Sequence, residues 1–246
     1  MYLSRTQIEE IAVAVMKDFN DFFFNEKTGR KKEDLQGTPI DQFAKDYLGL
    51  SVSFAHLSSD GNLCGLTAYA DTEFVLEENG QSKTIFLKQN QVILDMSFIT
   101  PGQVRNLCGK RRFTLAHECA HQILYQMQSE DGKTSCRKKY AAHTAYSLRD
   151  LKTKEDWNEW QANVLGAAIL MPQEQIDLAM WYFAASNKLK NYGGYFNYKD
   201  HSVLKMICQA FGVSKSAAII RLKELDYMEE YAYSDFRDPL EVWNEE

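Results

Sequence analysis

The sequence lacks the long apolar runs that carry a chain into or across a membrane. No segment contains the roughly eighteen consecutive apolar residues that a membrane-spanning helix needs. Glu9 and Glu10 lie where a secretory signal peptide would have its apolar centre. These absences argue against a membrane protein and against a secreted one, and we expect a protein of the cytoplasm.

Cysteine is scarce, and its pattern is typical of reduced thiols. The five cysteines are odd in number and scattered, and no two of them form a Cys-x-x-Cys pair. Such a pattern argues against a disulfide framework and against a cysteine zinc site, and it supports the cytoplasmic location. The positions are Cys64, Cys108, Cys119, Cys136 and Cys208.

Positive charge is also in short supply. The chain has 28 Lys and Arg against 34 Asp and Glu, for a net charge of −6. Broad nucleic-acid binding is therefore not expected, because it depends on a positively charged face. The hydrophobic content of 45% over 246 residues suits a globular protein with one large domain or two smaller ones.

The most definite chemical signal present is a His-Glu-x-x-His sequence formed by His117, Glu118 and His121. On a helix, residues four apart lie on one face, so both imidazoles can reach one metal ion. At ~100° per residue, Glu118 lies beside them and Cys119 points toward the apolar side. Histidines also occur on buried helix faces without a metal, so a third ligand is needed before a metal site is predicted.

Glu159 is the candidate for this third ligand. None of the other three histidines lies in a second metal-like spacing. Glu159 shares a predicted helix face with Ala162 and Gly166, and their small side chains would let this helix approach the motif helix closely. The alternative is a solvent-exposed glutamate on a helix that packs through Trp157 and Trp160.

Two motifs in order along the chain carry a family resemblance. The first is Arg-Phe-Thr-Leu-Ala-His-Glu-x-x-His at residues 112–121. The second is Glu159-x-x-Ala162-Asn163, followed by small residues and a closing Leu170-Met171-Pro172. Together they make the sequence similar to the ImmA/IrrE family of bacterial metallopeptidases, over about residues 38–226.

The residues and the resemblance together imply a zinc peptidase centre. His117, His121 and Glu159 would hold Zn²⁺, and the pattern leaves Mn²⁺ open as the alternative ion. Glu118 would act as the general base. Cys119-Ala120 departs from the Leu-Gly type of pair common in the family, and we interpret Cys119 as a core residue.

Other residues are candidates for supporting roles. Stabilisation of the oxyanion is predicted for His143 or a nearby tyrosine. Asn163, one turn from Glu159, is a candidate hydrogen-bond partner behind the ligand, with ordinary helix packing as the alternative. The tyrosines are Tyr125, Tyr140 and Tyr146.

The resemblance also implies a substrate, because members of this family cut helix-turn-helix transcriptional repressors and so release genes of mobile elements or stress responses. The residues themselves point only to peptide hydrolysis. A sheet edge beside the motif helix would be suited to hold an extended peptide by strand addition. The segment 129–154 is longer than the family pattern suggests, and it would affect access to the site.

The predicted elements follow an α+β order. Ser4 and Gln7 form a capping box that opens a helix through about Phe24, and Thr38 and Thr100 are predicted to cap two further helices, the second interrupted at Gly109. Asn79-Gly80 predicts a hairpin turn. Strands are expected at 50–55, 63–70, 73–77, 83–88 and 92–94, and later helices at 155–171, 173–185, 203–211 and 215–225.

These elements predict a zincin-like metallopeptidase domain at 1–172, a helical region with a helix-turn-helix-like pair at 173–226, and an acidic tail at 227–246. The pair supports an alternative function, a DNA-binding regulator that would use Lys215, Arg221 and Lys223. The acidic balance makes direct DNA binding the less expected function. A protein-binding scaffold of the antitoxin type, with a metal but no proteolysis, is the remaining alternative.

Overall fold

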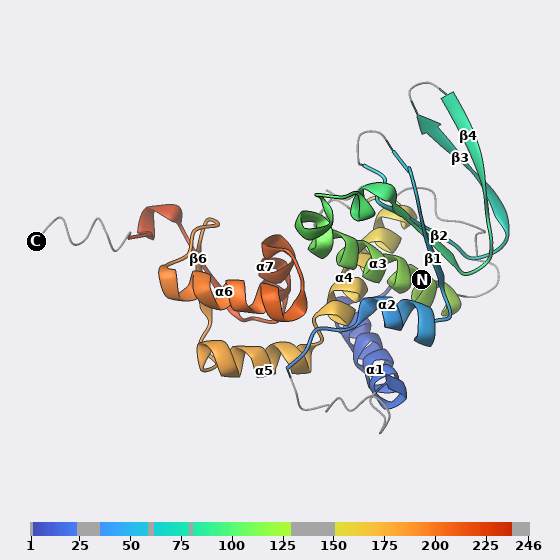
Figure 1. Ribbon diagram of the computed structural model, residues 1–246. Helices are drawn as coiled ribbons and strands as arrows, with labels where there is room; N and C mark the ends of the chain where they lie inside the picture. The colour runs from blue at the N-terminus through green and yellow to red at the C-terminus, as the bar shows by residue number, and fades with distance from the viewer. Residues whose placement is uncertain (1, 24–34, 59–61, 79–80, 129–150, 238–246) are drawn as a thin grey trace, which may run out of the picture. The chain divides into compact units, whose positions relative to one another are not determined.

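The computed structural model describes residues 2–23, 35–58, 62–78, 81–128 and 151–237 (Figure 1). The chain divides into two compact units. Unit 1 comprises Met1–Lys32 and Thr38–Leu170, and unit 2 comprises Glu33–Gly37 and Met171–Glu246. Helices and small sheets occur together, which confirms the α+β class; the predicted division at residues 172 and 226 stays a prediction.

Unit 1 begins with helix α1 (Arg5–Phe23), whose predicted capping box is present. The backbone N–H of Ser4 donates to Gln7 Oε1 at 2.9 Å, and the N–H of Gln7 donates to Ser4 Oγ at 3.3 Å. Each side chain thereby satisfies a donor that the first turn leaves without an intrahelical acceptor. One face of α1 is buried, through Ile8, Ala12, Met16 and Phe19.

The central sheet of unit 1 has three strands in the order β1 (Ser51–Ala55), β5 (Gln91–Asp95) and β2 (Gly65–Ala68). β1 runs parallel to β5, and β2 runs antiparallel to it. Within the described residues β2 pairs with β5 alone, so β2 is an edge strand.

A hairpin of β3 (Thr72–Glu78) and β4 (Gln81–Leu87) accompanies this sheet. Glu78 pairs with Gln81, which agrees with the predicted hairpin, although residues 79–80 of its turn lie outside the described residues. Residues of the hairpin, the sheet and the segment between β1 and β2 share one apolar cluster, formed by Leu57, Leu63, Leu66, Ala68, Leu76, Leu87 and Ile93. All five predicted strands are therefore present. Alternate side chains of a strand point to opposite faces, and burial of one face explains why apolar residues recur at every second position.

Two predicted helix caps are wrong, because Pro39 and Gln103 occupy the N-cap positions of the helices that follow and neither helix has a side-chain cap bond. Thr38 Oγ1 donates to the carbonyl of Ile169 at 2.6 Å, and α2 (Ile40–Gln42) continues into a π-helix at Phe43–Tyr47. Thr100 ends a 3₁₀ turn, and its hydroxyl donates to the carbonyl of Met96 at 3.1 Å.

The motif helix α3 (Val104–Gln126) is continuous, so the predicted break at Gly109 is also wrong. A helical glycine costs only about 1 kcal/mol relative to alanine, and packing of the helix offsets this cost. The second half of α3 is buried from Thr114 to Leu124. Helix α4 (Lys154–Leu170) lies against it and is buried from Glu159 onward except at Asn163.

Unit 2 contains helices α5 (Gln173–Ala184), α6 (Tyr198–Phe211) and α7 (Lys215–Glu224). Gly212 ends α6 in the left-handed conformation at φ 61°, and Ser214 caps α7 by accepting from the N–H of Ala217 at 3.2 Å. The axes of α6 and α7 meet at a bend of 101°, within the range of helix-turn-helix pairs. Whether the pair binds DNA stays a prediction.

The structure revises two details of unit 2. Two short parallel strands were not predicted: β6 (Leu189–Tyr192) lies between two predicted helices, and β7 (Met228–Tyr231) lies in the predicted acidic tail. Four-residue strands show too little periodicity to be recognised. Arg221, offered above for DNA binding, is fully buried, and its Nε donates to the carbonyl of Met171 at 3.1 Å.

Among the described residues no single helix has the length and apolar character to cross a membrane, and only the bent pair α6–α7 would pass that test jointly.

Candidate metal centre

Three buried side chains from α3 and α4 converge on one point. His117 Nε2 lies 3.0 Å from His121 Nε2, and the two carboxylate oxygens of Glu159 lie 3.4 Å from these nitrogens. All three donor groups lie within 4.8 Å of one another, and each residue is at most 5% exposed. Donors bound to one tetrahedral zinc ion at about 2.0–2.2 Å lie roughly 3.3 Å apart. The spacing found here therefore fits a single bound ion.

The close approach of α3 and α4 depends on Gly166. A Cβ atom placed on Gly166 would lie 3.1 Å from the backbone nitrogen of His117 and 3.2 Å from its Cα. Any side chain here would push α4 away from the helix that carries the two histidines. This confirms the expected closeness of the two helices at residue 166, and it explains how a carboxylate on one helix reaches imidazoles on the other.

Glu118, the predicted base, is fully buried beside the edge strand β2. A Cβ atom on Gly65 would lie 2.7 Å from Glu118 Oε1 and 2.7 Å from the Cγ2 of Thr114. The absence of a side chain at Gly65 thus makes room for the carboxylate. The sequence analysis did not single out Gly65, although a glycine inside an apolar strand often marks a close approach of this kind.

Further along, β2 and Tyr69, the residue that follows it, contact α3 at two more places. Gln122 Nε2 donates to Thr67 Oγ1 at 2.7 Å and to the carbonyl of Ala68 at 3.0 Å. The rings of Tyr69 and Tyr125 stack with centroids 4.0 Å apart and planes inclined by 4°. Hydrogen bonds and ring stacking therefore hold this segment against α3, alongside the candidate centre. Tyr125, predicted above as an oxyanion candidate, takes part in this stacking.

Cys119 lies among the ligand-bearing residues but faces the core. It is fully buried, and burial raises the pKa of its thiol well above the ordinary range, with the nearby Glu118 charge acting in the same direction. A metal ligand would need the thiolate, which this environment disfavours. The core role predicted for Cys119 agrees with its burial. The described cysteines form no disulfide.

The remaining predicted residues are not brought to the centre by the described structure. Asn163 is half-buried on α4, and no hydrogen bond joins it to Glu159 among the described residues. His143, Tyr140 and Tyr146 lie outside the described residues. The oxyanion-stabilising group therefore stays a prediction.

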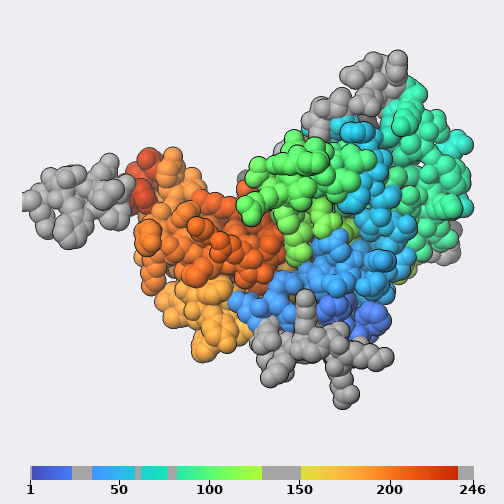
Figure 2. All heavy atoms as spheres, in the orientation of Figure 1, coloured from blue at the N-terminus to red at the C-terminus, as the bar shows by residue number. Residues whose placement is uncertain are grey.

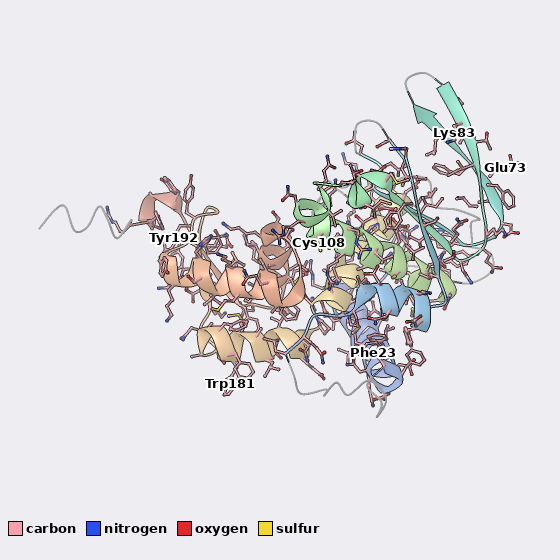
Figure 3. All side chains as sticks on the ribbon, in the orientation of Figure 1. Phe23, Glu73, Lys83, Cys108, Trp181 and Tyr192 are labelled. Carbon is pink, nitrogen blue, oxygen red and sulfur yellow. The ribbon has the colours of Figure 1, made fainter. Side chains whose placement is uncertain are left out.

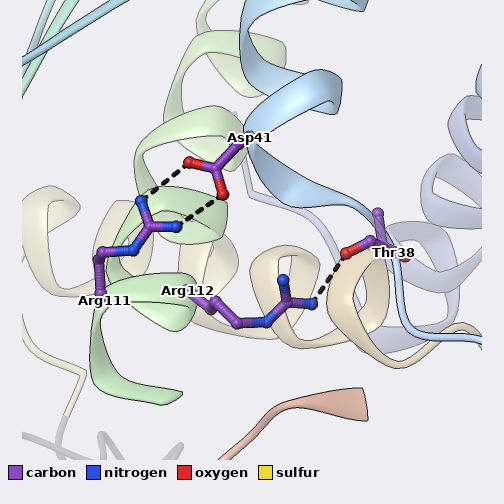
Figure 4. Close-up of polar contacts among 4 residues, drawn as sticks. All are labelled: Thr38, Asp41, Arg111 and Arg112. Atoms are coloured by element: carbon purple, nitrogen blue, oxygen red, sulfur yellow. Dashed lines mark hydrogen bonds and ion pairs between the residues drawn. The ribbon is translucent and has the colours of Figure 1, made fainter. Parts of the chain in front are cut away.

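Two arginines ahead of the motif tie α3 to the segment before the sheet (Figure 4). Arg111 forms a bidentate ion pair with Asp41: its Nη1 donates to Oδ1 at 2.8 Å and its Nη2 to Oδ2 at 2.6 Å. This pairing lowers the pKa of the Asp41 carboxyl. Arg112 donates to the carbonyl of Thr38 at 2.8 Å. Because the Thr38 hydroxyl in turn bonds to Ile169, this residue links α3 to the end of α4. The sequence motif contained Arg112 but gave no indication of this structural role.

The start of α3 is at the surface, whereas the centre is not. Residues 101–106 are exposed, and the space-filling view shows this green segment on the outside of unit 1 (Figure 2). The helix therefore passes from an exposed end into the interior, where it carries the two histidines and the glutamate.

A comparison with models of protein families finds a match. Residues 108–223 match the model of the peptidase M78 family, described as the IrrE N-terminal-like domain. This range includes both histidines, Glu118 and Glu159. A search of curated proteins finds no match.

Proposed function

We propose that the protein is a zinc-dependent endopeptidase of the ImmA/IrrE type, because residues 108–223 match the model of the IrrE N-terminal-like peptidase domain. The observation that carries this proposal is the convergence of His117, His121 and Glu159 donor atoms within 4.8 Å, next to a carboxylate that is not part of the cluster. Such a set of three protein donors is typical of catalytic zinc sites, which keep a further position for water.

The donor atoms and the base have separate roles in this proposal. When bound, zinc would lower the pKa of a water molecule toward ~7 and polarise the scissile carbonyl. Glu118 would accept the proton of the attacking water on its carboxylate and later pass it to the departing amine. The lack of a side chain at Gly65 leaves the room that this carboxylate occupies beside β2.

We propose that the peptide substrate adds as a strand along β2, the edge strand that lies beside α3. Cys64 offers its carbonyl to the N–H of Asp95, so Cys64 and its alternate neighbours bond toward β5. Gly65 and Thr67 therefore direct their backbone groups to the other edge. Both also lie against α3, so an added peptide would run past the candidate centre.

The proposed substrate is a helix-turn-helix repressor, as the family resemblance implies, and the proposed location is the cytoplasm. DNA binding by the chain itself is less favoured, because its three candidate basic residues are engaged within unit 2. Arg221 is buried, Lys223 pairs with Glu230 at 2.8 Å, and Lys215 lies 5.0 Å from the ring centre of Phe196. An antitoxin-type scaffold would have no need of a glutamate at position 118.

Co-expression with a repressor-like protein encoded beside the gene tests the function directly. Wild type should cleave this protein, and Glu118→Gln should reduce cleavage by about 10²–10⁴-fold because it removes only the base. Zinc stoichiometry, measured after purification, should be the same for both. Undiminished turnover in Glu118→Gln would refute the assignment of the base, and cleavage that survives thorough chelation would refute the metal.

The strand-addition step has its own test. Thr67→Pro removes a backbone N–H that would bond to a strand added along β2. The control is Thr67→Val, which loses the same hydroxyl bond to Gln122 but keeps the N–H. We expect a marked loss of kcat/KM in the proline variant relative to the valine variant. Equal values in the two would count against a peptide bound along β2.

A further inference from the structure

The outward face of α5 in unit 2 carries two exposed aromatic rings. Trp181 and Tyr182 are each 60% exposed, and their rings meet edge to face with centroids 4.7 Å apart. Figure 3 shows Trp181 projecting from α5. Tryptophan in particular is seldom so exposed, because its burial is strongly favourable, and exposed tryptophans are enriched among the residues that dominate binding. This pair therefore marks a candidate contact surface.

The same face of α5 carries negative charge. Asp177 lies one turn before Trp181 and Glu174 lies two turns before it, so all three share one side of the helix. The helix has no lysine or arginine of its own. Among the described residues, neither carboxylate forms an ion pair. The surface thus combines aromatic rings with carboxylates that form no ion pair within the described part of the chain.

Asp177 is held in place by unit 2. Tyr227 donates its hydroxyl to Asp177 Oδ1 at 3.0 Å. Burial and this carboxylate both raise the pKa of Tyr227, so the hydroxyl remains a donor at neutral pH. One oxygen of Asp177 is thereby fixed, and the other is left to meet a partner. A positioned carboxylate loses less conformational entropy on binding than a mobile one.

We propose that this face of α5, formed by Glu174, Asp177, Trp181 and Tyr182, binds an arginine-bearing segment of the protein substrate. The inference rests on the proposed function, since it assigns a docking surface to that substrate. Arginine fits because its planar guanidinium stacks on an indole ring while its N–H groups donate to a carboxylate one turn away. Lysine would meet the charge but not the ring stacking, and a nucleic-acid backbone would be repelled by the carboxylates.

The test measures binding without cleavage, using the full chain with Glu118→Gln. The probe is a short fluorescein-labelled Ala/Gln peptide with two arginines one helical turn apart, and the comparison peptide has citrulline in their place. Fluorescence anisotropy should show the citrulline peptide binding at least about tenfold more weakly, because citrulline keeps the shape and loses the charge. Adding Trp181→Ala or Asp177→Asn to the chain should each weaken arginine-peptide binding by about tenfold.

Phe86→Ala is the matched control. Phe86 is an equally exposed ring, at 61%, but it belongs to β4 of unit 1, so its removal should leave peptide affinity unchanged. No binding of the arginine peptide, equal binding of the citrulline peptide, or unchanged affinity in Trp181→Ala would each overturn the proposal. Failure of the proposed peptidase function would appear separately, as no repressor cleavage by the wild-type chain, whatever the peptide does.

Discussion

Unit 1 and unit 2 each bury ionisable side chains between helices, and they do so in different ways. In unit 1, His117, His121 and Glu159 direct their donor atoms at one shared point. In unit 2, the guanidinium of Arg221 is directed at the carbonyl of Met171, with Glu224 at 3.9 Å. The first arrangement brings together three groups that suit a cation, and the second provides a cation with acceptors from the chain itself.

The difference teaches that burial of a charged residue does not by itself identify a functional site. A buried arginine that bonds to a backbone carbonyl stabilises a local structure. In unit 1, two imidazole nitrogens lie 3.0 Å apart beside a carboxylate in a buried setting, and one cation would be a common partner for all three groups. Convergence of donors therefore distinguishes the candidate centre from the buried arginine, although all four residues are almost inaccessible to solvent.

The largest effect that would sharpen this comparison is expected from Glu159→Gln. Loss of one of three protein donors should weaken zinc binding by more than about a hundredfold, since even residues behind the ligands contribute ten- to a hundredfold. Competition against a chelating dye measures this. Glu155→Gln on the exposed first turn of α4 is the control and should bind zinc normally. Wild-type affinity in Glu159→Gln would remove this residue from the ligand set.

A smaller effect, confined to unit 2, is expected from Arg221→Ala. The substitution leaves a cavity and an unpaired carbonyl at Met171, and it should lower the free energy of unfolding by about 2–4 kcal/mol. Hydrogen exchange should accelerate in α5–α7 and not in α3. Lys223→Ala removes a half-exposed ion pair and should cost less than about 1 kcal/mol. A change in zinc affinity in Arg221→Ala would contradict the purely local structural role given to this residue.

The smallest effect is expected from Gly166→Ala, through crowding of α3 against α4. The added methyl group would meet the His117 backbone at 3.1 Å, and we expect a loss of about 1–3 kcal/mol together with weaker zinc binding. Gly109→Ala on the partly exposed part of α3 should instead stabilise the chain by up to about 1 kcal/mol. Thermal unfolding with and without zinc separates the two. Stabilisation by Gly166→Ala would mean that the helices have room to move apart.

Much of unit 1 could be predicted from the sequence because its signals are local. The capping box at Ser4, the five strands and the spacing of His117 and His121 depend on residues a few positions apart. Glu159 could be predicted as a candidate ligand because Ala162 and Gly166 indicated a close contact between two helices. Its family context came from the two motifs, and the match at residues 108–223 confirms that resemblance.

The remaining features depend on contacts between distant residues. Thr38 is a residue type that often caps helices, yet its hydroxyl donates to the carbonyl of Ile169, 131 positions away. Gly65 gains its meaning only when Glu118 is placed beside it. Arg221 looks like a surface base on a helix of basic character, and only the fold reveals that Met171 lies opposite. Local pattern cannot distinguish such partners, because tertiary packing decides between them.

The three contacts that β2 and the following Tyr69 make with α3 also limit how the chain can change in length. Gly65, Thr67 and Tyr69 follow the two-residue repeat of a strand, while Glu118, Gln122 and Tyr125 follow the turns of a helix. A single inserted residue after Thr114 would rotate all three helix residues by about 100° relative to the strand. Insertions and deletions should therefore be far more disruptive between residues 114 and 125 than substitutions at most of the same positions.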